Sequence, residues 1–168
     1  MKLTFITRFS LALLLALTAL AALAAPGWAA AFSGGDGLQA TPYEISSKAD
    51  LEALRDAVNG GTTYENMYFK LTADIDLGGT DWTPIGDANN PFKGNFDGDG
   101  KKITGLRVNV TTSHCAGLFG YVQGGAISNL AVSGNVALTY DNDAMVGGIV
   151  GSLFNGNISN CSFTGGCV

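Results

Sequence analysis

A segment of twenty residues occurs twice in this chain without a gap, and this repeat constrains the fold more than any other feature of the sequence. Residues 117–136 (GLFGYVQGGAISNLAVSGNV) align with residues 148–167 (GIVGSLFNGNISNCSFTGGC) at a constant offset of 31, with seven identical positions. A shorter and weaker copy begins at Gly94, so that the spacing between units varies from 24 to 31 residues. A period in this range is typical of stacked units that cannot bury their apolar faces alone.

The apolar residues within each unit follow the period of a strand. Leu130 and Val132 lie two residues apart in one unit, as Cys161 and Phe163 do in the next, and alternate residues of a strand point to one face. These short segments are bounded by Gly or Asn. We therefore predict an all-β chain folded as a parallel β-helix, a solenoid in which each coil stacks about 4.8 Å from the last.

The residues that recur in both units are predicted to be structural. Glycine tolerates left-handed or crowded backbone at the corners of a coil. Ile127 is expected to stack on Ile158, and Asn129 is expected to form a side-chain amide ladder with Asn160. The structural repeat residues are Gly117, Gly120, Gly125, Ile127, Asn129, Gly148, Gly151, Gly156, Ile158 and Asn160.

Residues 1–31 have the layout of a secretory signal peptide. Lys2 and Arg8 precede an apolar run at residues 9–25, and the small residues at 29–31 favour cleavage before Phe32. An uncleaved membrane anchor is the alternative, because the run approaches the minimum length of a bilayer span. We expect a secreted or cell-surface protein with no transmembrane span after cleavage.

Charge and cysteine content exclude some classes of partner and site. Residues 32–168 carry all 14 acidic side chains but only seven of the nine basic ones, a net charge of −7, so nucleic acid is excluded as a partner. The spacing of Cys115, Cys161 and Cys167 around the single histidine, His114, matches no metal site. Burial of the cysteines as small apolar residues is favoured, and their disulfide pairing stays open.

The segment before the repeats predicts a helix and then a strand. Ser47 and Asp50 form a capping-box pattern, and the apolar residues that follow predict a short helix at about residues 48–58. Such a helix could cover the open end of the stack, as terminal caps of solenoids do. The alternating sequence YFKLTADIDLGG at residues 68–79 predicts the first strand.

These segments together resemble the bacterial exported proteins that carry the GLUG motif. The resemblance rests on GGDGLQATPYEISSKADLEAL, YFKLTADIDLGG, WTPIG, PFKGNFDGDGKKITGL and the units GLFGYV and GGIVGSLF, in this order. It implies a right-handed parallel β-helix, secreted or exposed at the bacterial surface, often within a larger adhesin-like or protease-associated chain. It implies no catalytic residue.

The expected organisation follows from the resemblance and the repeats together. We predict a signal peptide at residues 1–31, an N-terminal cap region at 32–92 and glycine-rich β-helix repeats at 93–168. Because proteins of this group continue through many more units, we expect the chain to be truncated at its C-terminus. The insertion at residues 137–145 is expected to be an exposed loop.

Acidic side chains are the candidates for catalysis. Asp74 and Asp76 are predicted to share one strand face about 6.6 Å apart, a spacing compatible with inverting glycosidases. However, Lys70 is the only basic residue near them in the sequence, and catalysis needs one acid with a raised pKa. We favour solvated or turn-capping acids, with surface calcium ligation as the next alternative.

Three further patterns are candidate ligand sites. Residues 95–100 (NFDGDG) resemble half of a calcium loop, but Leu106 stands where an EF-hand needs glutamate, which favours a tight Asx turn. The basic residues Lys93, Lys101, Lys102 and Arg107 could contact an acidic glycan, although a solubilising strand face is favoured. For Trp82, a core position is favoured over sugar stacking.

The sequence therefore predicts a non-catalytic exported scaffold or adhesion module without cofactor or metal. A host or extracellular-matrix glycan or protein is the expected partner, and end-to-end self-association is expected at an unpaired edge. One alternative is a polysaccharide-active β-helix enzyme that uses Asp74, Asp76 or Asp97. The other is an N-terminal non-catalytic domain of a larger surface protease.

Overall fold

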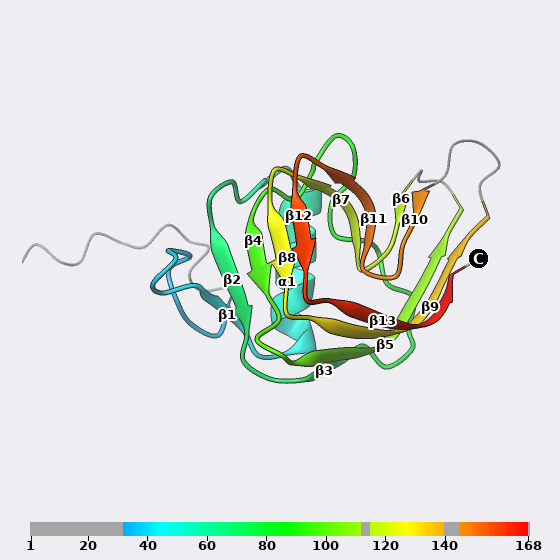
Figure 1. The fold of residues 1–168 in the computed structure, drawn as a ribbon, viewed down its shortest axis with the longest axis horizontal. Coiled ribbons are helices and arrows are strands. Elements are labelled where there is room, and N and C mark those ends of the chain that lie inside the picture. The colour runs from blue at the N-terminus through cyan, green and yellow to red at the C-terminus, as the bar shows by residue number, and fades with distance from the viewer. Residues whose placement is uncertain (1–31, 112–114, 140–144, 168) are drawn as a thin grey trace, which may run out of the picture.

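The fold is almost entirely β-structure, with one helix near the N-terminus (Figure 1). A computed structural model describes residues 32–111, 115–139 and 145–167. The predicted signal peptide, His114 and residues 140–144 of the predicted loop lie outside the described residues. The elements are β1 (Tyr43–Ile45), α1 (Lys48–Asn59), β2 (Tyr68–Leu71), β3 (Ile75–Asp76), β4 (Asn95–Asp97), β5 (Lys102–Val110), β6 (Cys115–Ala116), β7 (Phe119–Gln123), β8 (Ala126–Ser128), β9 (Ala131–Leu138), β10 (Met145–Val146), β11 (Val150–Phe154), β12 (Asn157–Ser159) and β13 (Ser162–Cys167).

All pairings between these strands are parallel. One sheet has five strands in the order β1-β2-β4-β8-β12, and a second has four in the order β13-β9-β5-β3. Two further sheets pair β6 with β10 and β7 with β11. Figure 1 shows the five strands of the first sheet side by side in chain order. Strands far apart in the sequence therefore lie side by side, and we call the segment from one strand to its partner in the same sheet a coil.

The register of these pairs places apolar residues in columns. Phe69 pairs with Phe96, Phe96 with Ile127, and Ile127 with Ile158 in the five-stranded sheet. A second column in the four-stranded sheet contains Ile75, Ile103, Val132 and Phe163. The predicted stacking of Ile127 on Ile158 is thus present in the register.

Aromatic rings extend the columns through the interior. Phe69 lies 5.0 Å from Tyr64 and 5.8 Å from Phe92, and Phe119 lies 5.2 Å from Phe92 and 5.4 Å from Phe96, as ring centroids. These tilted and edge-on contacts are the arrangements that aromatic pairs prefer. Burial, with a further contribution from the nearby Tyr43, raises the pKa of Tyr64 to about 12.

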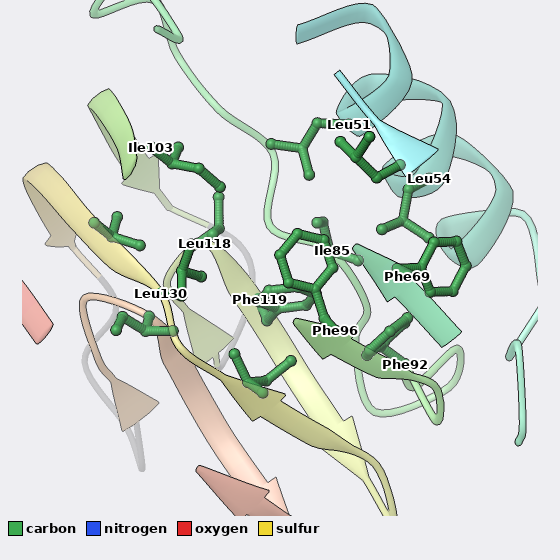
Figure 2. Packing of buried hydrophobic residues seen from close by; sticks show 14 of the residues in the cluster. Leu51, Leu54, Phe69, Ile85, Phe92, Phe96, Ile103, Leu118, Phe119 and Leu130 are labelled. Carbon is green, nitrogen blue, oxygen red and sulfur yellow. The ribbon is translucent and has the colours of Figure 1, made fainter. Parts of the chain in front are cut away.

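Helix α1 begins at a capping box and buries its apolar face in the core. The Ser47 side chain accepts a hydrogen bond from the Asp50 amide, and the Asp50 carboxylate accepts from the Ser47 amide at 3.1 Å. Leu51, Leu54 and Val58 are fully buried, and Figure 2 shows Leu51 and Leu54 extending from the helix toward the buried rings. No helix among the described residues is long and apolar enough to cross a bilayer.

The strand predicted over residues 68–79 is wrong in two respects. It is not the first strand, because β1 precedes it, and it is broken into β2 and β3. Phe69, Leu71, Ile75 and Leu77 are all buried as the alternation predicts. The break has a topological cause, because β2 belongs to the five-stranded sheet and β3 to the four-stranded sheet, so the chain turns a corner between them.

The recurrent glycines are needed for space and not for a left-handed backbone. The glycines at 117, 120, 125, 148, 151 and 156 all have negative or extended φ, since none is among the described residues with positive φ. A Cβ on Gly156 would lie 2.6 Å from the carbonyl oxygen of Gly125, and one on Gly151 would lie 2.8 Å from the amide nitrogen of Ala116. Two equivalent pairs of the repeat have a left-handed backbone, Asn129 with Asn160 (φ of 53° and 52°) and Gly124 with Asn155 (φ of 72° and 52°).

Candidate functional site

A shallow groove of about 550 Å³ runs across the outer face of the five-stranded sheet. We call it the outer groove, and its floor is formed by β2, β4 and β8. The groove is lined by Gln39, Ala40, Pro42, Tyr68, Phe69, Lys70, Asn95, Phe96, Asp97, Ala126 and Ser128. Most of its lining side chains are polar or small, in contrast to the apolar columns on the inner face of the same strands.

The register of the sheet arranges the floor in two rows. Tyr68 pairs with Asn95 and Asn95 with Ala126, which forms the first row. Lys70 pairs with Asp97 and Asp97 with Ser128, which forms the second. Since alternate residues of a strand point to opposite faces, these rows flank the buried Phe69–Phe96–Ile127 column on the other side of the sheet.

The charged groups of the floor are engaged by neighbouring residues. The Lys70 ammonium lies 3.3 Å from a carboxylate oxygen of Asp99. Asp97 Oδ1 accepts hydrogen bonds from the Asp99 amide and from Asn129 Nδ2, both at 2.9 Å. The groups of the floor that carry no charge are the Tyr68 ring, the Asn95 amide and the Ser128 hydroxyl.

A tight turn at residues 36–41 forms the wall of the groove beside β2. Asp36 accepts hydrogen bonds from the Thr41 hydroxyl and, at 3.1 Å, from the Leu38 amide. Both bonds lower the pKa of Asp36, and the bond from Thr41 has the larger effect. The turn is tied to the sheet by a 2.9 Å hydrogen bond from the Tyr68 amide to the Gly37 carbonyl, so the wall has a defined position.

An amide ladder connects three coils at the corner next to the groove. Asn160 Nδ2 donates to Asn129 Oδ1 at 2.8 Å, and Asn129 Nδ2 donates to Asp97. The predicted Asn129–Asn160 pair is therefore present. Asp97 was missed as its third member, because it is not the counterpart of Asn129 in the repeat: the pairing of β4 with β8 places Asp97 beside Ser128.

The predicted carboxylate pair on one strand is not present. Asp76 lies in β3, whereas Asp74 lies in the corner before it. Asp74 accepts a hydrogen bond from the Lys102 amide at 2.9 Å, and Asp76 accepts from the Gly78 amide at 2.8 Å. Both acids are exposed and stabilise backbone turns, as the favoured interpretation of the sequence predicts.

The NFDGDG segment forms an Asx turn, in which Asp97 accepts from the Asp99 amide. Asp99 has a left-handed φ of 49°. Within the part of the chain that the structure describes, no group of three or more His, Cys, Asp or Glu side chains is placed to hold a metal ion.

The four basic residues singled out in the sequence mostly have separate acidic partners. Lys93 lies 3.8 Å from Glu65, Lys101 lies 4.0 Å from Asp99, and Arg107 lies 3.0 Å from Asp81. Lys102 is exposed on β5. This dispersed pairing fits the favoured strand-face interpretation better than a single anionic-glycan site.

Trp82 and the cysteines also have structural surroundings. Trp82 is buried, donates from Nε1 to the Leu118 carbonyl at 3.1 Å and lies under the Arg55 guanidinium, 4.9 Å from the ring centroid. Cys115 is buried, and burial together with the charge of Asp87 raises the pKa of its thiol. Cys161 is partly buried and Cys167 is exposed, both as free thiols, so the expected burial of all three is wrong for Cys167.

The groove itself was not predicted from the sequence. Tyr68 and Asn95 become neighbours only through the pairing of β2 with β4, and the two strands share no repeated polar residue. The alternation around Phe69 and Phe96 indicates that the residues beside them face outward, and it is the only signal in the sequence that points to this surface.

Comparison with known protein families identifies a sequence motif in the last coil. Residues 142–166 match the family described as "Glug: The GLUG motif". The chain is 36% identical over 133 residues to the "Putative Gly-rich membrane protein" of Evansella cellulosilytica, across 78% of this chain and 15% of that protein. It is 33% identical over 144 residues to the halomucin of Haloquadratum walsbyi, across 78% of this chain and 2% of that protein.

A solved structure shares the fold over most of the chain. The crystal structure of a "putative immunoglobulin A1 protease" from Bacteroides ovatus aligns with a TM-score of 0.61 and 25% identity, across 81% of this chain and 41% of that one. The chain thus spans less than half the length of each of these proteins. On the match to its last coil, this is a protein that contains the GLUG motif.

Proposed function

We propose that the chain is a non-catalytic, exported scaffold or adhesion module that presents its loops and its outer groove at the bacterial cell surface. In this proposal the stacked coils form a right-handed parallel β-helix, and α1 is its N-terminal cap. The parallel register of all the described strand pairs supports the stacking, and the burial of Leu51, Leu54 and Val58 against the core supports the cap.

The observation that carries this proposal is the use of polar side chains within the stack itself. Asp97, Asn129 and Asn160 bond to one another across three coils, and Asp74 and Asp76 bond to backbone amides. A catalytic acid or base must be placed to exchange a proton with substrate. Groups committed to hydrogen bonds that hold the coils together are better suited to a scaffold.

The relatives support a surface location. The names of the matched proteins include a Gly-rich membrane protein, a halomucin and an immunoglobulin A1 protease. The first of these names assigns its protein to a membrane, and the leader-like residues 1–31 of this chain fit export. These observations support the proposed location at the cell surface or outside the cell.

Two measurements test the proposal. Antibody labelling and protease treatment of intact cells should reach the protein, whereas protection until lysis would contradict surface exposure. The full chain should release no reducing or unsaturated ends from pectin, alginate or host glycans. If the original chain releases such ends and Asp74→Asn, Asp76→Asn or Asp97→Asn abolishes the release, the chain is a polysaccharide-active enzyme instead.

A second candidate is a non-catalytic domain of a larger surface protease. The similarity to the Bacteroides ovatus structure favours it, because this chain covers 41% of that protein. Sequencing the gene around this coding region tests the idea directly. A protease domain encoded in the same reading frame would support it, and a reading frame that contains only further glycine-rich units would favour the scaffold alone.

A further inference from the structure

We propose that the outer groove binds an extended, neutral saccharide. This inference rests on the proposed function, since it assigns a ligand class to the surface that an adhesion module would present. Three properties of the groove support this ligand class: the pairing of its floor strands, the pairing of its charges and the chemistry of its uncharged side chains.

The floor strands offer no free backbone to a ligand. β2, β4 and β8 are all interior strands of the five-stranded sheet, with β1 and β12 at its edges. A peptide that adds as an extra strand needs the unpaired N–H and C=O groups of a sheet edge. The groove therefore recognises its ligand through side chains, which disfavours strand addition by a peptide.

The charges of the floor disfavour an acidic ligand. The one lysine, Lys70, lies 3.3 Å from an Asp99 carboxylate oxygen, and the one acid, Asp97, lies in the same row. An anionic polymer would have to displace Asp99 from Lys70 while it approached Asp97. It would also meet a domain of net charge −7 over residues 32–168.

The remaining groups match a chain of hydroxyl-bearing rings. Tyr68 presents an aromatic ring with a polar tip, and such side chains combine apolar contact with a hydrogen bond. Asn95 and Gln39 offer amides and Ser128 a hydroxyl, which can both donate and accept. Asn95 Nδ2 lies 3.4 Å from the Met67 carbonyl, which orients its side chain.

The geometry also favours an elongated ligand. The rows Tyr68–Asn95–Ala126 and Lys70–Asp97–Ser128 run perpendicular to the strands, with steps of about 4.8 Å from one coil to the next. The groove is bounded at one end by the turn at Gln39 and Ala40 and extends over three coils. A linear saccharide can follow this direction, whereas a compact ligand would contact one coil only.

The test is affinity electrophoresis of the full chain in gels that contain one polysaccharide each. Xylan, mannan, β-glucan and galactan are the neutral probes, and alginate and polygalacturonate are the acidic ones. We expect at least one neutral polysaccharide to retard the protein and the acidic ones to leave it unretarded. Tyr68→Ala should weaken this binding by about tenfold, equivalent to about 1.4 kcal/mol.

Two further variants separate binding from folding. Ala126→Trp fills the groove from its floor and should abolish retardation. Tyr121→Ala removes a similarly half-buried tyrosine from β7, outside the groove, and should leave retardation unchanged. The inference is overturned if no neutral polysaccharide retards the protein, if only acidic ones do, or if Tyr68→Ala and Ala126→Trp bind like the original chain.

The outcome is distinguishable from failure of the proposed function. If the protein is exposed on intact cells and releases no sugar ends, the scaffold function stands. If no neutral polysaccharide retards it in the same case, the saccharide assignment is wrong. Release of sugar ends or protection from labelling overturns the scaffold function whatever the electrophoresis shows.

Discussion

Ile127 pairs in parallel register with Ile158, yet Ile127 is 0% exposed and Ile158 is 40% exposed. The two residues occupy equivalent positions in the repeated unit. Ile127 is covered on both sides, by Phe96 and by Ile158, whereas β12 is the edge strand of its sheet. Position within the stack, and not side-chain chemistry, therefore decides how much each isoleucine contributes to stability.

Substitution of these two isoleucines should separate their contributions. Ile127→Ala removes buried methyl groups and leaves a cavity, so we expect a loss of about 2–5 kcal/mol in the free energy of unfolding. Ile158→Ala removes a half-exposed side chain from the last coil and should cost less than about 1.5 kcal/mol. Urea unfolding of both variants measures the difference, and equal losses would contradict the stacking described here.

The amide ladder predicts a different pair of variants. Asn129→Gly removes the hydrogen bonds to Asp97 and Asn160 but tolerates the φ of 53° and should cost about 1–2 kcal/mol. Asn129→Ala removes the same bonds but keeps a Cβ in the left-handed region. The alanine variant should therefore be about 1 kcal/mol less stable than the glycine variant. If chemical denaturation shows alanine to be as stable as glycine at this position, the left-handed corner is wrong.

Asp50 predicts a dependence of stability on pH. Burial raises its pKa, but hydrogen bonds from the Ser46 amide, Ser33 and Ser47 outweigh burial, and the net effect lowers the pKa. A carboxyl whose pKa is lower in the folded state stabilises the fold above its unfolded pKa of about 3.9. That contribution is lost as the pH falls through the folded pKa.

The Asp50→Asn variant measures this contribution. At neutral pH it should unfold about 1–3 kcal/mol more easily than the original chain, and the difference should shrink under acid conditions. Asp56→Asn, an exposed acid on the same helix, is the matched control and should change little. A constant difference between the Asp50 variant and the original chain from neutral to acid pH would exclude the assigned role.

The last coil predicts self-association of this chain at one end. Residues 147–167 carry no charge, and β12 and β13 are sheet edges, which lack the charged residues that usually block edge pairing. Helix α1 near the N-terminus packs on the core instead, and its Lys48 and Asn59 bond to the Leu77 and Pro84 carbonyls. The exposed large apolar side chains of the last coil are Met145, Val146, Leu153, Phe154 and Ile158.

If the unpaired strands β12 and β13 of the described residues form the contact, association should stop at a dimer with the two last coils together. Sedimentation equilibrium of the full chain should show monomer and dimer, and Leu153→Lys should shift the equilibrium to monomer. Leu38→Lys changes an exposed leucine near the N-terminal side and should leave the dimer intact. A protein that stays monomeric at all concentrations, or forms long filaments, contradicts this arrangement.

Residues that repeat were the ones whose places could be predicted. The constant offset between Ile127 and Ile158 and between Asn129 and Asn160 predicts their pairing, and the capping box at Ser47 and Asp50 predicts where α1 begins. In each case the physical cause is local or periodic, and it is therefore visible in the sequence.

Features that depend on contacts between unlike segments could not be predicted in this way. The corner that separates Asp74 from Asp76 interrupts an alternation that continues without change in the sequence, because both sides of the corner face the same core. At Gly120 and Gly151 the sequence left open a left-handed or a crowded backbone, and the structure shows the close approach of another coil. The outer groove likewise arises from the pairing of β2 with β4, which no repeated residue marks.

The proposed scaffold depends on the stacking of successive coils in the register described. Nuclear Overhauser contacts between backbone protons in the full chain test it most directly, without any substitution. The stacking predicts contacts from Ile127 to both Phe96 and Ile158, which are 31 residues away on either side. Contacts from Ile127 to neither residue, or only to residues near it in the sequence, would contradict the stack and the scaffold built on it.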